Sequence, residues 1–209
     1  MTKNTVRVWD PLVRLFHWTL VAAFIIAYVT GEEENMVHIY AGYYILGLLV
    51  FRVVWGFTGT RYARFSNFIY SPRRTVQYLK GMVAGKPEHF TGHNPAGGWM
   101  IVMLLVSLSL TTWTGLEYYG LEGHGPLAAV SIEITPVAPA HADDDEYEEH
   151  EGHGEEHSPE EEFWEELHEI TANLTVLLIV VHVAGVVVAS RQHGENLVRS
   201  MITGDKSAP

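Results

Sequence analysis

Four long apolar stretches, separated by very polar segments, constrain the fold of this chain more than any other feature. They lie at about residues 12–30, 39–57, 99–118 and 170–189. Each is close to the roughly 20 residues that an α-helix needs to cross the hydrocarbon core of a bilayer. The stretches predict an all-α fold, a membrane-embedded four-helix bundle, and a single membrane domain over residues 1–209.

The basic residues predict how this bundle is oriented. All 13 lie on one side of the four predicted spans, whereas the two opposite segments, 31–37 and 117–169, contain none but hold 3 and 18 acidic residues. Lys and Arg collect in cytoplasmic segments of membrane proteins. We therefore expect both termini to be cytoplasmic, in a multi-pass protein of the bacterial inner membrane. The basic residues are Lys3, Arg7, Arg14, Arg52, Arg61, Arg64, Arg73, Arg74, Lys80, Lys86, Arg191, Arg199 and Lys206.

Two further features of the sequence limit how the first apolar stretch can be interpreted and which cofactors the chain can bind. A basic start before an apolar run could also be a secretory signal, but no small-residue cleavage site follows Val29, so we interpret the first stretch as a retained span. The chain has no cysteine. This excludes disulfides, thiolate-bound metals, iron–sulfur clusters and covalently attached haem. Any haem in this protein would be held by His or Met.

Four histidines at or within the predicted spans are the informative polar residues. His168 and His182 are 14 residues apart, which is roughly 21 Å along a helix and close to four full turns. They therefore share a helix face at opposite membrane depths. His38 begins the second span at the outer level of His168, and His17 lies near the cytoplasmic start of the first span, at the level of His182. Two pairs result, one in each leaflet.

Ionisable residues within spans are costly and usually mark ligands or proton pathways. Two neutral imidazoles fill both axial positions of a haem iron, which suits electron transfer better than oxygen binding. The paired depths favour two b-type haems over four separate histidines that are only satisfied polar residues at helix interfaces. Arg14 and Arg52 could pair with the propionates of the cytoplasmic haem, or be basic residues that reach the membrane surface from a span end.

Small residues near these histidines are compatible with a flat macrocycle. They are equally well explained by close helix packing alone. These residues are Gly42, Gly47, Ala184 and Gly185.

At these positions the chain resembles the bacterial di-haem cytochrome b family that includes the membrane subunit of nickel-iron hydrogenases. The resemblance covers nearly all of the chain outside the acidic outer segment. It implies that His17 with His182, and His38 with His168, ligate the two haems. The matching pieces are Arg14-Leu15-Phe16-His17-Trp18, His38-Ile39-Tyr40-Ala41-Gly42, Gly92-His93-Asn94-Pro95, Leu167-His168-Glu169 and the tail from Glu195 to Gly204.

The resemblance implies transmembrane electron transfer between the quinone pool and an outer redox partner, such as a periplasmic c-type cytochrome or a hydrogenase. The fourth span is also similar to that of the bacterial superoxide oxidase, so a superoxide:quinone oxidoreductase is an alternative. The fold alone does not decide between them. Membrane lipid and quinone are the small-molecule partners that we expect.

An acidic, His-rich insertion at residues 131–162 departs from the family pattern. Its composition predicts a loose outer loop with little to bury. It could steer a basic redox partner, and it could also bind a divalent metal, so a metal-responsive membrane protein is a second alternative. The insertion includes Asp143, Asp144, Asp145, His141, His150, His153 and His157.

The cytoplasmic segment between the second and third spans is long enough for a small amphipathic element such as Arg73 to Val83. The aromatic residues of this segment could lie at the lipid headgroups, as aromatic residues at membrane interfaces do. Three histidines on the cytoplasmic side could take up protons or simply cap and pack. The aromatic residues are Tyr62, Phe65, Phe68 and Tyr70, and the histidines are His89, His93 and His193.

Overall fold

The computed structural model describes residues 5–31, 35–86, 88–128 and 158–207. Four of its helices are long and apolar enough to cross a membrane, which confirms the predicted membrane-embedded helical bundle. These four are α1 (Pro11–Val29), α2 (Met36–Thr58), α5 (Pro95–Leu121) and α6 (Pro159–His193). The shorter elements are β1 (Thr5–Arg7), α3 (Phe65–Phe68), α4 (Pro72–Val83), α7 (Leu197–Thr203) and β2 (Asp205–Ser207).

Side-chain caps determine where the long helices begin. Asp10 and Asn94 accept backbone N–H groups of the first turns of α1 and α5, and each is followed by a proline. Proline is favoured at the first helical position because its missing N–H has no partner there in any case. The side chain of Asn35 likewise accepts backbone N–H groups of the first turn of α2. These caps set the helix starts within a few residues of the predicted spans.

The start of α6 differs most from the prediction. The helix begins at Pro159, 11 residues before the predicted span at 170. Ser158 and Glu161 form a capping box, which satisfies two N–H groups that a helix start otherwise leaves free. Three glutamates in the first turn interact favourably with the helix dipole. The last four residues of the predicted loop at 131–162 are therefore helical, and residues 131–157 lie outside the described part of the chain.

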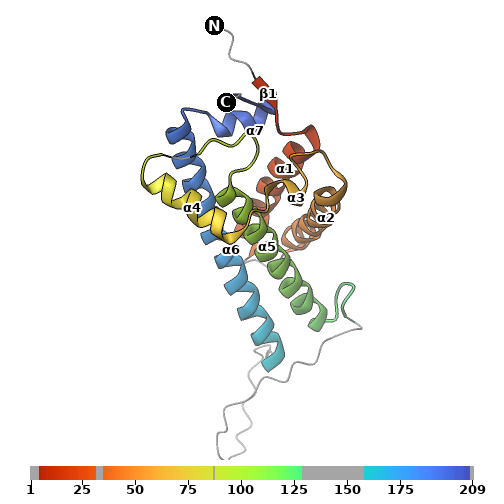
Figure 1. Ribbon diagram of the computed structural model, residues 1–209. Coiled ribbons are helices and arrows are strands. Elements are labelled where there is room, and N and C mark those ends of the chain that lie inside the picture. The colour runs from red at the N-terminus through yellow and green to blue at the C-terminus, as the bar shows by residue number, and fades with distance from the viewer. Residues whose placement is uncertain (1–4, 32–34, 87, 129–157, 208–209) are drawn as a thin grey trace, which may run out of the picture.

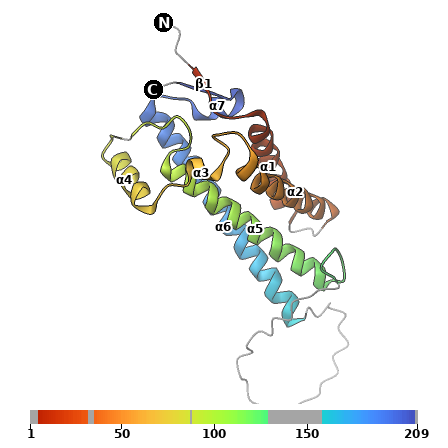
Figure 2. The same cartoon turned by 45° about the vertical axis from the view of Figure 1, so that its right-hand side comes forward.

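The long helices pack as two pairs, α1 with α2 and α5 with α6, and contacts between α2 and α5 join the pairs (Figures 1 and 2). A small apolar cluster lies where the pairs meet. Many large apolar side chains on the outside of the bundle remain exposed, as expected for helices that face lipid. The cluster consists of Ala23, Ala27, Ala41, Ile45, Leu49 and Leu108.

The two ends of the chain are clasped together at one end of the bundle (Figure 2). β1 pairs antiparallel with β2. The backbone N–H groups of Val8 and Trp9 donate to the carbonyl of Gly204. Next to this clasp, Trp18 Nε1 donates to the carbonyl of Met201, 3.4 Å away. The first and last described elements of the chain therefore lie at the same end of the bundle, as four spans require, and the cytoplasmic location of this end stays a prediction.

The aromatic residues after α2 do not all lie where the sequence suggested. Phe68 is 0% exposed, so its expected position at the lipid headgroups is wrong. Its ring lies 5.7 Å from that of Phe65, which in turn contacts Phe57. The rings of Phe65 and Phe68 lie against the buried guanidinium of Arg52, because covering a guanidinium with ring faces is more favourable than leaving it in an apolar interior.

Candidate cofactor site

His38 on α2 and His168 on α6 face each other near the end of the bundle that is remote from the termini. Their ring centroids are 6.0 Å apart and their planes are nearly perpendicular. Bonds between a metal and an imidazole nitrogen are about 2 Å long, so two rings on opposite sides of one metal have centroids about 6 Å apart. The observed separation fits a single metal centre held between the two side chains.

The hydrogen bonds of both rings leave the same nitrogen free. His38 Nδ1 donates to the carbonyl of Ala27 at 2.8 Å, and His168 Nδ1 donates to the carbonyl of Thr111 at 2.9 Å. A carbonyl oxygen can only accept, so each Nδ1 carries the proton and each Nε2 carries a lone pair. Metal-binding histidines usually have their second nitrogen fixed in this way. Both rings are thus prepared to bind a metal through Nε2.

A row of buried hydroxyl groups between α5 and α6 supports His168. Thr114 Oγ1 lies 3.2 Å from His168 Nδ1 and 3.3 Å from Thr171 Oγ1. Further along the same interface, Thr175 Oγ1 contacts the hydroxyls of Ser107 at 2.7 Å and Thr111 at 3.2 Å. Hydroxyl groups buried in an apolar region need such partners. The row aligns the two helices and holds the His168 ring in one orientation.

Gly115 also positions His168, and the sequence analysis missed it. A Cβ atom added at Gly115 would lie 2.8 Å from His168 Cε1, closer than two such carbon atoms can approach. A glycine inside a helix costs about 1 kcal/mol relative to alanine, so a glycine in the middle of an apolar span often has a packing reason. The sequence shows that Gly115 interrupts an apolar span, but it does not show that the glycine faces His168.

His17 on α1 and His182 on α6 form the second predicted pair. Both are half-buried, and they are close enough to interact electrostatically. α1 packs mainly against α2, and α6 against α5, so the two histidines lie on helices from different pairs. His17 Nδ1 is buried and has no hydrogen-bond partner among the described residues. A buried imidazole nitrogen without a partner is unfavourable, and the ring of His17 therefore differs from those of His38 and His168, whose Nδ1 atoms are fixed by backbone carbonyls.

Two of the four predicted small residues lie on the faces that carry the histidines. Gly42 follows His38 by four residues and Gly185 follows His182 by three, and a Cβ added at either would meet nothing within 4 Å. Gly47 and Ala184 lie about half a turn around their helices from the histidines. Open space therefore adjoins one histidine of each pair, and the other two small residues face elsewhere.

Arg52 and Arg14 were predicted to bind carboxylate groups of a cofactor. Arg52 is only 3% exposed, and its Nη1 has no hydrogen-bond partner among the described residues. Arg14 differs, because its Nη1 donates to the carbonyl of Ile202 while its buried Nε has no partner in the described chain. A buried cation without a hydrogen-bonding anion is costly. Arg52 in particular fits a site that receives an anionic group.

The negative charge of Asp10 acts on the guanidinium of Arg52. Its carboxylate accepts hydrogen bonds from Thr60 at 2.5 Å, the backbone of Val13 at 2.9 Å and Trp55 at 3.3 Å. Burial raises the pKa of this carboxyl group, but the hydrogen bonds together outweigh burial and lower the pKa below its usual value. Asp10 is therefore ionised at neutral pH and ties the start of α1 to the end of α2.

His93 lies beside this region, between the rings of Trp9 at 4.4 Å and Phe68 at 4.8 Å. Burial, together with the positive charges of Arg52 and Lys206, lowers the pKa of His93 to about 3. The side chain is therefore neutral at physiological pH, which favours a packing role over proton uptake. His89 is different, because its Nε2 lies 3.0 Å from Glu195 Oε1 and its ring is 5.4 Å from that of His193.

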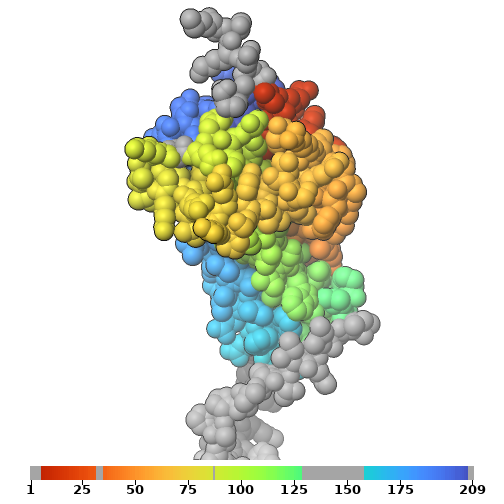
Figure 3. Space-filling model, in the orientation of Figure 1, coloured from red at the N-terminus to blue at the C-terminus, as the bar shows by residue number. Residues whose placement is uncertain are grey.

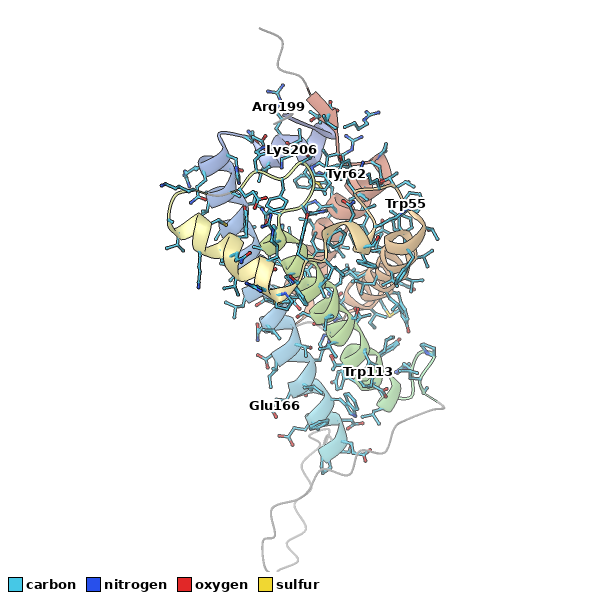
Figure 4. The ribbon with its side chains drawn as sticks, viewed as in Figure 1. Trp55, Tyr62, Trp113, Glu166, Arg199 and Lys206 are labelled. Carbon is cyan, nitrogen blue, oxygen red and sulfur yellow. The ribbon has the colours of Figure 1, made fainter. Side chains whose placement is uncertain are left out.

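The labelled residues in Figure 4 show the two ends of the molecule. Trp55, Tyr62, Arg199 and Lys206 lie at the end where β1 and β2 pair, and Trp113 and Glu166 lie toward the other end.

Among the described residues, no cluster of three or more His, Cys, Asp or Glu could hold a metal ion. The predicted metal-binding histidines of the insertion, from His141 to His157, lie outside those residues.

The family profile described as prokaryotic cytochrome b561 matches residues 8–204 of the chain. The match includes every helix from α1 to α7. No curated protein and no solved structure matches the chain.

Proposed function

Because the chain belongs to the prokaryotic cytochrome b561 family, whose members carry out transmembrane electron transfer through b-type haem, we propose that this bundle holds two such haems. One would be ligated by His38 and His168 and the other by His17 and His182. The observation that carries this proposal is the 6.0 Å separation of the His38 and His168 rings, with Nε2 free on both.

The remaining parts of the site fit the same proposal. A haem bound at each level would supply a reversible one-electron centre near each face of the membrane. The unpartnered nitrogens of Arg52 and Arg14 would bind propionate groups at the inner level. Thr111 and Ala27 fix the ligand rings through their carbonyls, and the apolar outer surfaces of the helices keep bulk water away from both centres.

We further propose that the protein connects the quinone pool with an outer redox protein, either a c-type cytochrome or a hydrogenase. The charge distribution supports an outer partner with a basic surface. Glu165, Glu166 and Glu169 are exposed on α6, at the end of the bundle that also bears the acidic insertion. An acidic surface attracts basic partners and speeds their association, and this effect weakens as the salt concentration rises.

The test of this function is reduction of the purified protein by a quinol analogue, followed by oxidation by a basic c-type cytochrome at low and high salt. We expect both steps to be fast and the second step to slow as salt increases. Reduction by superoxide with transfer to quinone, and no reaction with the cytochrome, would instead establish the superoxide:quinone oxidoreductase. Deletion of residues 140–157 tests the metal-responsive alternative, because an electron carrier should keep its haems and its quinol reaction.

Arg52→Gln is expected to lower the midpoint potential of one haem and leave the other nearly unchanged. The guanidinium is buried at the inner level, and a nearby positive charge stabilises the reduced, less positive iron. The measurement is a redox titration followed at the haem absorption bands. Arg61→Gln is the control, because Arg61 is exposed on the same side of the bundle. Two unchanged potentials in Arg52→Gln would contradict the assignment of Arg52.

Thr114→Val tests the support of His168. The variant keeps the shape of the side chain but removes the hydroxyl that lies 3.2 Å from Nδ1. We expect both haems to be retained and the potential of the outer one to rise, because a weaker hydrogen bond makes the imidazole a poorer donor to the oxidised iron. Thr112→Val is the control, since the Thr112 hydroxyl donates to the carbonyl of Leu108 in its own helix. An identical outer-haem potential and electron paramagnetic resonance spectrum in both variants would contradict this role.

A further inference from the structure

α4 is held at the level where the membrane helices end. It lies in the connection between Thr58, the last residue of α2, and Pro95, the first residue of α5. Gln192 Nε2, near the end of α6, donates to the carbonyl of Met82 in α4 at 3.0 Å. Figure 1 shows α4 beside the first turns of α5. The helix is thus placed at one membrane surface, outside the bundle.

Two contacts determine which side of α4 faces the rest of the protein. Tyr78 is buried, and its ring lies 5.6 Å from that of Phe90. Arg74 forms an ion pair with Glu88 at 2.6 Å. Phe90 and Glu88 both belong to the segment that leads to α5, so α4 is tied to this segment at two points. The rotation of the helix about its own axis is therefore defined.

This rotation leaves an apolar stripe exposed on α4. Val76, Leu79 and Val83 occur at spacings of three and four residues, which places them on one side of a helix. Val83 is 91% exposed, and the other two are about half exposed. Arg73 and Lys80 are also exposed and lie beside the stripe. Figure 3 shows that α4 forms part of the outer surface of this face.

The charge around α4 is opposite to that of the whole chain. Residues 59–94 contain six basic residues and a single acidic one, Glu88, in a protein whose formal net charge is -12. The carboxylate of Glu88 is already paired with Arg74. The surface next to the apolar stripe therefore carries unbalanced positive charge. A helix with an apolar stripe flanked by Lys and Arg is typical of helices that lie in the plane of an anionic membrane surface.

We propose that α4 binds anionic phospholipid. The stripe of Val76, Leu79 and Val83 inserts among the acyl chains at the membrane surface, and Arg73 and Lys80 bind the headgroup phosphates beside it. The contact with α6 determines the depth of α4, and the contacts of Tyr78 and Arg74 determine its rotation. The positive charge of the exposed residues indicates that its ligand is anionic. This lipid site does not depend on the haem assignment.

The chain has no cysteine, so single labels test this proposal on the full-length protein. Leu79→Cys carries an environment-sensitive fluorophore on the stripe, and Gln77→Cys carries it on the exposed polar side as the matched control. Both labelled proteins are placed in nanodiscs of phosphatidylcholine, with or without phosphatidylglycerol. In every nanodisc the same fraction of the phosphatidylcholine is brominated on its acyl chains. We expect brominated lipid to quench the label at Leu79 several-fold more than the label at Gln77, and more strongly when phosphatidylglycerol is present.

Adding Arg73→Gln and Lys80→Gln to the labelled protein should remove the dependence on phosphatidylglycerol while the haem content stays the same. Quenching at Leu79 that is independent of lipid charge in the parent protein would overturn the anionic lipid site. A label at Leu79 that stays in water in every nanodisc would also overturn it, and would mean that the stripe serves a protein partner.

Discussion

His168→Ala is expected to lower the haem content from two per chain to one, and His182→Ala is expected to remove the other haem. Each substitution would delete one of the two histidines proposed to ligate one haem, and the ring of His168 has no equivalent among its described neighbours that could replace it. The two single-haem proteins should differ in midpoint potential because they retain haems at different membrane depths. The measurement is a pyridine haemochrome assay on detergent-purified protein, followed by a redox titration.

His124→Ala is the matched control for these variants. His124 is an exposed histidine just beyond α5, on the same side of the bundle as His168, and it should be dispensable for haem binding. Retention of both haems in His168→Ala or in His182→Ala would contradict the ligand assignment. Loss of both haems in His168→Ala, with loss of the helical signal, would indicate unfolding, and His168→Met then tests the site with a substitute ligand of similar size.

Gly115→Ala is expected to displace His168 and to remove or greatly weaken the outer haem while the inner haem remains. The added Cβ would lie 2.8 Å from His168 Cε1. The ring cannot move aside freely, because its Nδ1 is bound to the carbonyl of Thr111 and α5 packs closely on α6. Haem content and redox titration again provide the measurement.

Gly47→Ala is the control for the glycine substitution, because a Cβ at Gly47 meets nothing within 4 Å. It should keep both haems and should be slightly more stable than the parent, since alanine favours helix over glycine by about 1 kcal/mol. Two unperturbed haems in Gly115→Ala would show that His168 lies elsewhere in the folded protein and would contradict the geometry described above.

The fold could be predicted from the sequence because apolar length alone identifies a membrane helix. Three of the predicted spans lie within α2, α5 and α6, and the first, at 12–30, extends one residue beyond the end of α1 at Val29. Exact helix ends were predicted less well, because they depend on polar residues outside the apolar stretch. The capping box at Ser158 and Glu161 extends α6 into a segment that its acidic composition had assigned to the loop.

That His38 lies opposite His168 could be predicted, because helix geometry converts the spacing of the histidines into depth and face; the role of the four histidines as haem ligands stays a prediction. Their supporting groups could not be predicted. The acceptors of His38 and His168 are the carbonyls of Ala27 and Thr111, and a backbone carbonyl has no sequence signature. Which acceptor each ring meets depends on how α1 packs against α2 and how α5 packs against α6.

The terminal clasp was also absent from the prediction. β1 and β2 have three residues each and lie almost 200 residues apart in the chain. Strands this short have no clear alternation of apolar and polar residues, and their pairing depends on the bundle, which places the two ends side by side. The inward position of Phe68 has a similar cause, because the aromatic residues of a membrane-surface segment can cover a buried cation such as Arg52 instead of contacting headgroups.

The most direct test of the central claim is the number and type of haems in the unmodified protein. A pyridine haemochrome assay with protein quantitation, combined with low-temperature electron paramagnetic resonance, measures both the stoichiometry and the axial ligation. The two histidine pairs predict two b-type haems per chain, each low-spin with two histidine ligands. One haem per chain would contradict one of the pairs, and a chain without haem would contradict the proposed function as a whole.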